Sequence, residues 1–244
     1  MNRSRPSFER FLGMLAVASF ALAVAAQESP SHKQNARPEK SSAVPASQAA
    51  PGLNSSARFS YEFTQPQFFL RHILIEHDAS GHGKITFERL NEEVPIVENL
   101  EISPAALERI SALWQALKFL DSETNYQSEK QFPHLGTMKL SMIEGEKKRT
   151  AEFNWSNVPE ASDLAKEYRR VADQASFVFD ISVARENQPL NAPKLMEALE
   201  SLLKRNGLSD PKQLVPLLKE INSDERLPLI ARNHAVRLLA KVNK

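Results

Sequence analysis

The residues best suited to chemistry lie close together between positions 71 and 82. This stretch holds three of the six histidines of the chain together with two carboxylates. Imidazole and carboxylate groups are common ligands of catalytic zinc. Successive side chains of a strand point to opposite faces, so His72 and His77 cannot both bind one ion from regular strand geometry. A metal site here requires His77, Asp78 and His82 to converge at the following turn.

Two interpretations of this stretch remain open. In one, the hairpin from His72 to His82 is the centre of a metal-dependent hydrolase. In the other, it ends in a solvated turn, with one histidine packed against the sheet and no cofactor. The segment from Asp78 to Arg89 also resembles part of an EF-hand loop. It does not favour calcium, because Arg89 is a cation where the ion needs a bidentate carboxylate.

The composition excludes several other classes of function. The chain has no cysteine, so it has no thiol nucleophile, thiolate zinc site or iron–sulfur cluster. Its seven glycines form neither a phosphate-binding loop nor a Gly-x-Ser-x-Gly elbow. The net charge is +1, which gives no electrostatic footprint for nucleic acid or for an anionic membrane surface.

Strands with one buried face are expected to position these residues. Apolar and polar side chains alternate around Phe59, Tyr61 and Phe63, and this period of two is typical of a half-buried strand. The denser apolar run up to His77 indicates a more central strand. The same reasoning predicts six strands, at residues 59–64, 68–77, 84–90, 97–102, 138–142 and 151–155.

Two helices are expected to pack on this sheet. Ser103 and Pro104 are a favourable N-cap and first helical residue, and apolar residues then recur every three or four positions as far as Leu120. A longer helix is predicted from Pro159 to Arg185. We therefore predict an α+β domain over residues 58–187, an antiparallel sheet with helices packed on one face.

Certain large side chains are expected in the core of this domain. Trp114 and Trp155 each fall on an apolar stripe. The apolar face of the longer helix is expected to be covered as well, and it holds Leu164, Tyr168, Val171, Ala175 and Val178.

The pattern is purely helical from residue 188 to residue 244, which predicts a small C-terminal helical subdomain. Its last two helices resemble a single HEAT-type repeat. The matching residues are Asp210, Pro211, Leu214, Val215, Leu218, Ile230, Arg232, Ala235 and Leu239. The resemblance covers residues 210–243, and a solenoid needs about three repeats. It implies a small helical docking surface rather than an enzyme.

The first 26 residues have the pattern of a cleavable signal peptide. Three arginines precede an uncharged, largely apolar run from Phe11 to Val24, and small residues follow. The run is shorter than the about 20 apolar residues that span a membrane, so cleavage after Ala25 or Ala26 is expected, with no stable membrane insertion afterwards. Without a cysteine for lipid attachment, the product is expected to be secreted or periplasmic. Residues 27–57, rich in Pro, Ser and Ala, are predicted to form a disordered linker.

The expected function is contact with a protein partner outside the cytoplasm, without catalysis. The α+β part resembles domains of uncharacterised exported bacterial proteins, which implies a location and no activity. In the C-terminal helices, Arg232, His234 and Arg237 lie among apolar residues. They are the candidate contacts for an unidentified protein partner. The metal-dependent hydrolase is the alternative, and nucleic acid is not an expected partner.

Overall fold

The computed structural model describes residues 55–243. The expected signal peptide and the expected linker up to residue 54 lie outside the described residues. All strands and helices that the apolar patterns predict fall within the described range.

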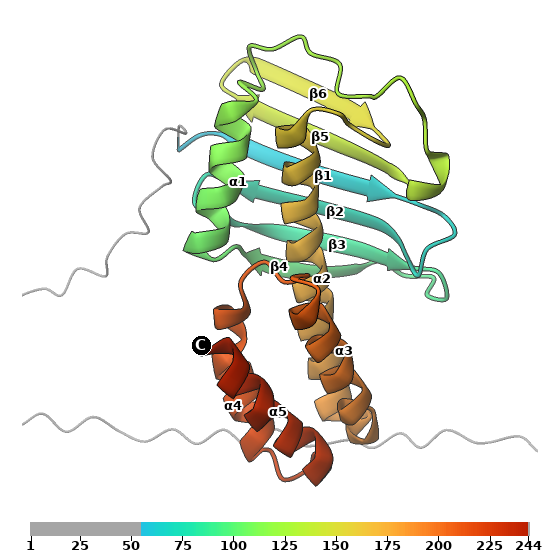
Figure 1. The fold of residues 1–244 in the computed structure, drawn as a ribbon, viewed down its shortest axis with the longest axis vertical. Helices are drawn as coiled ribbons and strands as arrows, with labels where there is room; N and C mark the ends of the chain where they lie inside the picture. Colours follow the sequence, from blue (N-terminus) through green and yellow to red (C-terminus); the bar gives the residue numbers. More distant parts are fainter. Residues whose placement is uncertain (1–54, 244) are drawn as a thin grey trace, which may run out of the picture. The chain divides into compact units, whose positions relative to one another are not determined.

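The strands are β1 (Arg58–Thr64), β2 (Leu70–Asp78), β3 (His82–Arg89), β4 (Ile96–Glu101), β5 (Thr137–Glu144) and β6 (Lys147–Phe153). They form one antiparallel sheet in the order β4-β3-β2-β1-β5-β6 (Figure 1). The first strand of the chain is therefore internal, with β2 on one side and β5 on the other. The two edges of the sheet are β4 and β6.

The sheet has one apolar and one polar face, because side chains alternate along each strand. Phe59, Tyr61 and Phe63 of β1 are all buried on the apolar face. On the polar face, Glu62 Oε1 lies 3.1 Å from His72 Nε2 of β2. This separation of faces is the one that the period of two predicts.

Helices α1 (Pro104–Ala116) and α2 (Pro159–Asn187) cover the apolar face (Figure 1). Helix α1 begins as predicted, because the Ser103 side chain accepts a hydrogen bond from the Ala106 N–H at 3.3 Å and Pro104 is the first helical residue. Helix α2 begins at Pro159 without a side-chain cap, so we infer that its position depends on the tertiary packing of its apolar face.

A chain of hydrogen bonds crosses the core between the sheet and both helices. Trp114 Nε1 of α1 donates to the Tyr168 hydroxyl of α2 at 2.9 Å, and that hydroxyl lies 2.7 Å from His77 Nε2 of β2. His77 Nδ1 lies 2.7 Å from the Asp78 carbonyl oxygen. A neutral His77 protonated on Nδ1 satisfies both of its contacts, since the Tyr168 hydroxyl can then donate to Nε2.

The C-terminal half of α2 joins a second apolar cluster. Phe177 and Ile181 of α2 pack there with residues of three further helices. These are α3 (Ala192–Lys204), α4 (Val215–Ser223) and α5 (Leu229–Val242). Three short 3₁₀ helices complete the described chain: η1 (Pro133–Leu135), η2 (Pro189–Asn191) and η3 (Pro211–Leu214).

The predicted α+β class is confirmed, with an antiparallel sheet and a C-terminal helical part. Trp114 is buried as expected, but Trp155 is not: it follows the end of β6 and is 45 % exposed. Val178 was also expected to be covered, and it is 37 % exposed, because it lines a groove beside β4.

Replacing Tyr168 with Phe should lower the free energy of unfolding by about 3 kcal/mol, because Trp114 Nε1 and His77 Nε2 would both stay buried without a partner. Urea unfolding of the purified variant measures this. Ser182→Ala is the control, since its hydroxyl is exposed and bonds only to its own helix; it should change stability by less than about 0.5 kcal/mol. Equal stability of Tyr168→Phe and the wild type would contradict the role of the network.

Candidate functional site

His77 is the histidine of the hairpin that packs into the core. It is 3 % exposed, and its ring stacks on Phe59 with the centroids 5.1 Å apart. Both ring nitrogens already have partners, in Tyr168 and the Asp78 carbonyl. Burial lowers the pKa of His77 to about 4, so it is neutral at pH 7. This matches the interpretation in which one histidine packs against the sheet.

Asp78 and His82 serve the turn between β2 and β3. The Asp78 carboxylate accepts hydrogen bonds from the Ser80 N–H, the Ser80 hydroxyl and the His82 N–H at 2.9, 2.5 and 3.2 Å. Partial burial raises the pKa of Asp78, but these hydrogen bonds and the Arg58 charge outweigh that effect and lower it overall. His82 Nδ1 is exposed and contacts the Ser80 hydroxyl at 2.8 Å. Gly81 supplies the positive φ of 85° that the turn requires.

The candidate metal ligands therefore do not converge. A hollow does lie beside the hairpin and includes His77, Asp78 and His82 among its lining residues, but the His77 nitrogens point to Tyr168 and to the backbone instead. Across residues 55–243, no group of three or more His, Asp or Glu side chains could hold a metal ion. Arg89, at the last position of the EF-hand-like pattern, is buried and paired with Asp180 at 2.6 Å.

The three candidate contacts of the C-terminal helices lie in different environments on α5. His234 is 5 % exposed and faces α3, with its Nε2 3.2 Å from Glu200 Oε2. Its side chain therefore packs between α5 and α3. Arg232 is half-buried, with an Nε atom that lacks a partner within the described residues. Arg237 is exposed.

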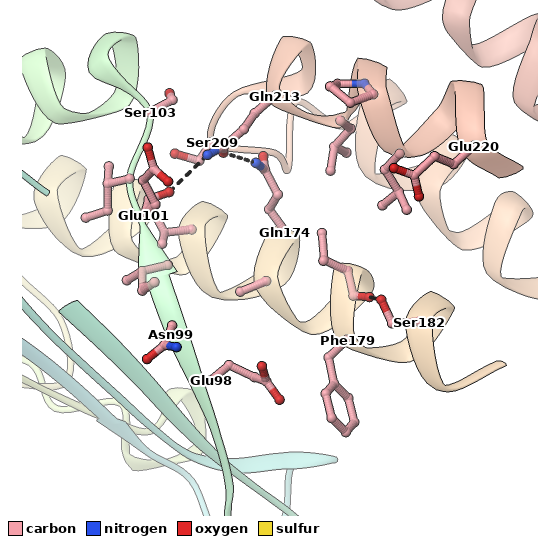
Figure 2. Close-up of a pocket in the computed structure, with 18 of the residues that line it drawn as sticks. Glu98, Asn99, Glu101, Ser103, Gln174, Phe179, Ser182, Ser209, Gln213 and Glu220 are labelled. Atoms are coloured by element: carbon pink, nitrogen blue, oxygen red, sulfur yellow. Dashed lines mark hydrogen bonds between the residues drawn. The ribbon is translucent and has the colours of Figure 1, made fainter. Parts of the chain in front are cut away.

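A larger groove lies elsewhere, along the outer side of β4. Its volume is about 570 Å³, within the range of about 300–1,000 Å³ that is common for binding sites. β4 and the start of α1 form one wall, the C-terminal half of α2 the second, and η3 with α4 the third. Figure 2 shows Glu98 and Phe179 entering this space from β4 and α2. We call it the β4 groove.

The apolar surface of the β4 groove comes mainly from helices. On α2, Val178 and Val183 are each 37 % exposed, and Phe179 stands between β4 and the helix. Leu217 of α4 faces them. Phe179 also packs against Phe87 of β3, whereas Val178 and Val183 remain exposed toward the groove.

Two glutamines fix the closed end of the groove. Gln174 of α2 donates to Gln213 Oε1 at 2.7 Å and accepts from the Asp210 N–H at 2.9 Å. Gln213 in turn donates to the Glu101 carbonyl oxygen of β4 at 2.9 Å (Figure 2). The groove walls from β4, α2 and η3 are thus joined by direct hydrogen bonds.

The charge of the β4 groove has one sign. Every charged side chain among its described lining residues is acidic: Glu98, Glu101, Glu186 and Glu220. Glu220 is paired with Arg185 at 2.9 Å. Glu98 and Glu101 have no ion-pair partner within the described residues. The groove therefore favours a cationic occupant over an anionic one.

Three serine hydroxyl groups line the groove. Ser103 caps α1, and the Ser182 hydroxyl donates to the Val178 carbonyl oxygen of its own helix at 2.8 Å. The third serine, Ser209, has a buried Oγ without a hydrogen-bond partner within residues 55–243. No histidine or lysine is among the described lining residues. The chemistry available is apolar contact, carboxylate pairing and backbone hydrogen bonding.

Sequence reasoning did not find the β4 groove. Glu98 and Glu101 were visible as charges on a predicted strand, and Val178 as an apolar residue on a predicted helix face. The missing information was that β4 is an edge of the sheet and that α2 extends beyond it.

No protein-family model matches the chain, and no curated protein matches it at a significant level. Within residues 55–243, no helix combines the length and the apolar character needed to cross a membrane.

Because His77 is buried and neutral, the free energy of unfolding should decrease as the pH is lowered. Its pKa is about 4 in the folded chain and about 6.5 in the unfolded chain. The unfolded state therefore binds more protons between these values, and the free energy of unfolding should fall by about 3 kcal/mol from pH 6.5 to pH 4. Urea unfolding at several pH values measures the slope.

His77→Gln should flatten this slope, although it lowers stability at pH 7 as well. The control His82→Gln removes an exposed histidine of the same hairpin and should keep the wild-type slope. If His77→Gln and the wild type lost the same free energy between pH 6.5 and pH 4, a neutral buried His77 would be ruled out.

Proposed function

We propose that this chain is an exported binding protein, without catalytic activity of its own, that takes a segment of a partner protein into the β4 groove. The observation that carries the proposal is the uncovered apolar wall of α2 beside a free sheet edge. Contiguous exposed apolar surface with a polar rim is characteristic of interaction sites, and grooves of this kind are used to bind peptide segments.

The geometry favours binding over hydrolysis. The candidate catalytic histidine is buried with both nitrogens occupied, and no histidine is among the described residues that line the β4 groove. A partner recognised by apolar and acidic surface needs none of these groups. The C-terminal helices then have a role in the site, because η3 and α4 provide its third wall.

Export is part of this proposal, on the basis of the N-terminal pattern of residues 1–26. Expression in a bacterial host followed by N-terminal sequencing of the periplasmic fraction tests it. We expect a mature N-terminus at Ala26 or Gln27. Recovery of the full-length chain in the membrane fraction would show that the segment is an uncleaved anchor.

A charge placed in the apolar wall should weaken binding. Selection from a phage-displayed library of random peptides on the immobilised protein should enrich binders. Val178→Arg should lower the affinity for these peptides more than about tenfold, because it buries a cation against the bound peptide. Val236→Arg is the matched control, since it changes an exposed valine on α5 that lies outside the groove. Fluorescence anisotropy of the selected peptides measures both affinities.

Equal binding to Val178→Arg and to the wild type would place the binding surface elsewhere. If binding were lost on Val236→Arg instead, the exposed face of α5 would replace the groove as the binding surface. Circular dichroism and thermal unfolding confirm that each variant is folded before binding is compared.

A further inference from the structure

The backbone of β4 presents unpaired groups to the β4 groove. The Ile102 N–H donates to the Gly81 carbonyl oxygen at 3.0 Å, on the β3 side, whereas the Glu101 carbonyl oxygen accepts from Gln213, on the groove side. Consecutive residues of an antiparallel strand direct their N–H and C=O groups to opposite sides. It follows that Val97 and Asn99 direct theirs into the groove, as Glu101 does.

No strand among residues 55–243 pairs with that side of β4. The other edge of the sheet is different, because the connection that follows α1 lies along β6 (Figure 1). Arg149 of β6 holds this connection by donating to the carbonyl oxygens of Phe119 and Thr124 at 2.6 and 2.7 Å. Thus a connecting segment runs beside β6, whereas the outer side of β4 faces the groove.

The acidic side chains of β4 restrict what can pair with it. Charged residues on an edge strand normally prevent contact with other sheet edges. Glu98 and Glu101 would repel a second copy of β4 but attract a basic strand. Glu101 can face a basic side chain across the ladder, and Glu98 adds attraction at longer range. The same side chains that protect the edge therefore define the partner.

The two faces of an added strand would meet different surfaces. Glu98 is on the same face of β4 as the buried Leu100, so it faces the helices. Added residues on that face would contact Val178 and Phe179 of α2. On the other face they would meet Asn99 and Glu101. An occupant therefore alternates apolar and basic residues and lacks proline, which cannot donate to the strand ladder.

We propose that the β4 groove binds an extended, basic segment of a partner protein by addition of a strand to β4. This inference rests on the proposed function, because it assumes that the groove is the binding surface. It adds the chemistry of the partner and the hydrogen bonds that align it.

The test uses a capped peptide of alternating valine and lysine, about seven residues long, and the full-length protein. Hydrogen exchange followed by NMR should show new protection of the Val97 and Asn99 amides on binding. The Ile102 amide, already bonded to Gly81, should change little. New protection confined to α2 or α4 would overturn strand addition.

Two N-methylated versions of the peptide give an independent measurement. Methylation of all valine amides or of all lysine amides removes the donors on one side of the strand only. One version should lose affinity more than about tenfold, and the other should bind much as the parent peptide does. Equal binding of both versions and the parent would contradict pairing through the backbone.

The charge requirement is tested by the double variant Glu98→Gln, Glu101→Gln. Its affinity for the peptide should fall about tenfold at low salt, and most of the salt dependence should disappear. Glu146→Gln, Glu152→Gln is the matched control, because it removes two exposed carboxylates outside the groove, one in the turn before β6 and one in β6. Equal effects of the two double variants would contradict recognition at β4.

The two proposals can fail separately. If library-selected peptides bind and Val178→Arg weakens them, but they are neither basic nor sensitive to N-methylation, strand addition is wrong and the groove remains the binding surface. If no peptide is selected and Val178→Arg has no effect, the proposed function itself is wrong. A dimer that forms through β4, detected by analytical ultracentrifugation and broken by Val97→Pro, would make a second copy the occupant instead.

Discussion

The length of α2 relative to the width of the sheet is the constraint on which the rest of the structure depends. Six strands about 4.8 Å apart span about 24 Å between the two edges, whereas the 29 residues of α2 rise about 44 Å. The helix crosses the strands (Figure 1), so almost half of it must extend beyond an edge. Its apolar stripe continues along this extension. A second set of helices is therefore needed to bury Phe177 and Ile181, and the β4 groove is the surface that this second set leaves uncovered.

Polar contacts fix the direction in which the extension leaves the sheet. Arg89 at the end of β3 is buried among aromatic rings and donates to Asp180 of α2 at 2.6 Å. Nearer the middle of α2, Arg109 of α1 contacts Glu167 and also donates to the Ser209 carbonyl oxygen at 2.6 Å. Ion pairs of this kind, buried only in part, add little net stability. Their geometry is directional, and we infer that they hold the helical part in one position against the sheet, which a preformed groove requires.

The apolar patterns predict the elements well and their arrangement poorly, for physical reasons. Alternation reports which strand face is buried, so all six strands and the Ser103 cap could be predicted. It does not report strand order, which depends on the distant pairing of β1 with β5. The alternation correctly predicted that His77 and His72 point to opposite faces of the sheet. It did not predict the partner of His77, because Tyr168 lies 91 residues away in the sequence. Val178 and Trp155 were misplaced because periodicity measures apolar character and not the presence of a facing surface.

The acidic side chains of β4 limit aggregation and leave the edge uncovered. An open edge beside an apolar groove promotes aggregation, and burying it under a loop would remove the binding surface. Glu98 and Glu101 keep the edge hydrated and repel an identical edge, at the expense of carboxylates that no described cation neutralises. A basic strand relieves this repulsion as it pairs. The selectivity of the groove then comes from electrostatics, because the acidic edge repels an identical edge and attracts a basic strand. It does not come from the shape of a closed pocket.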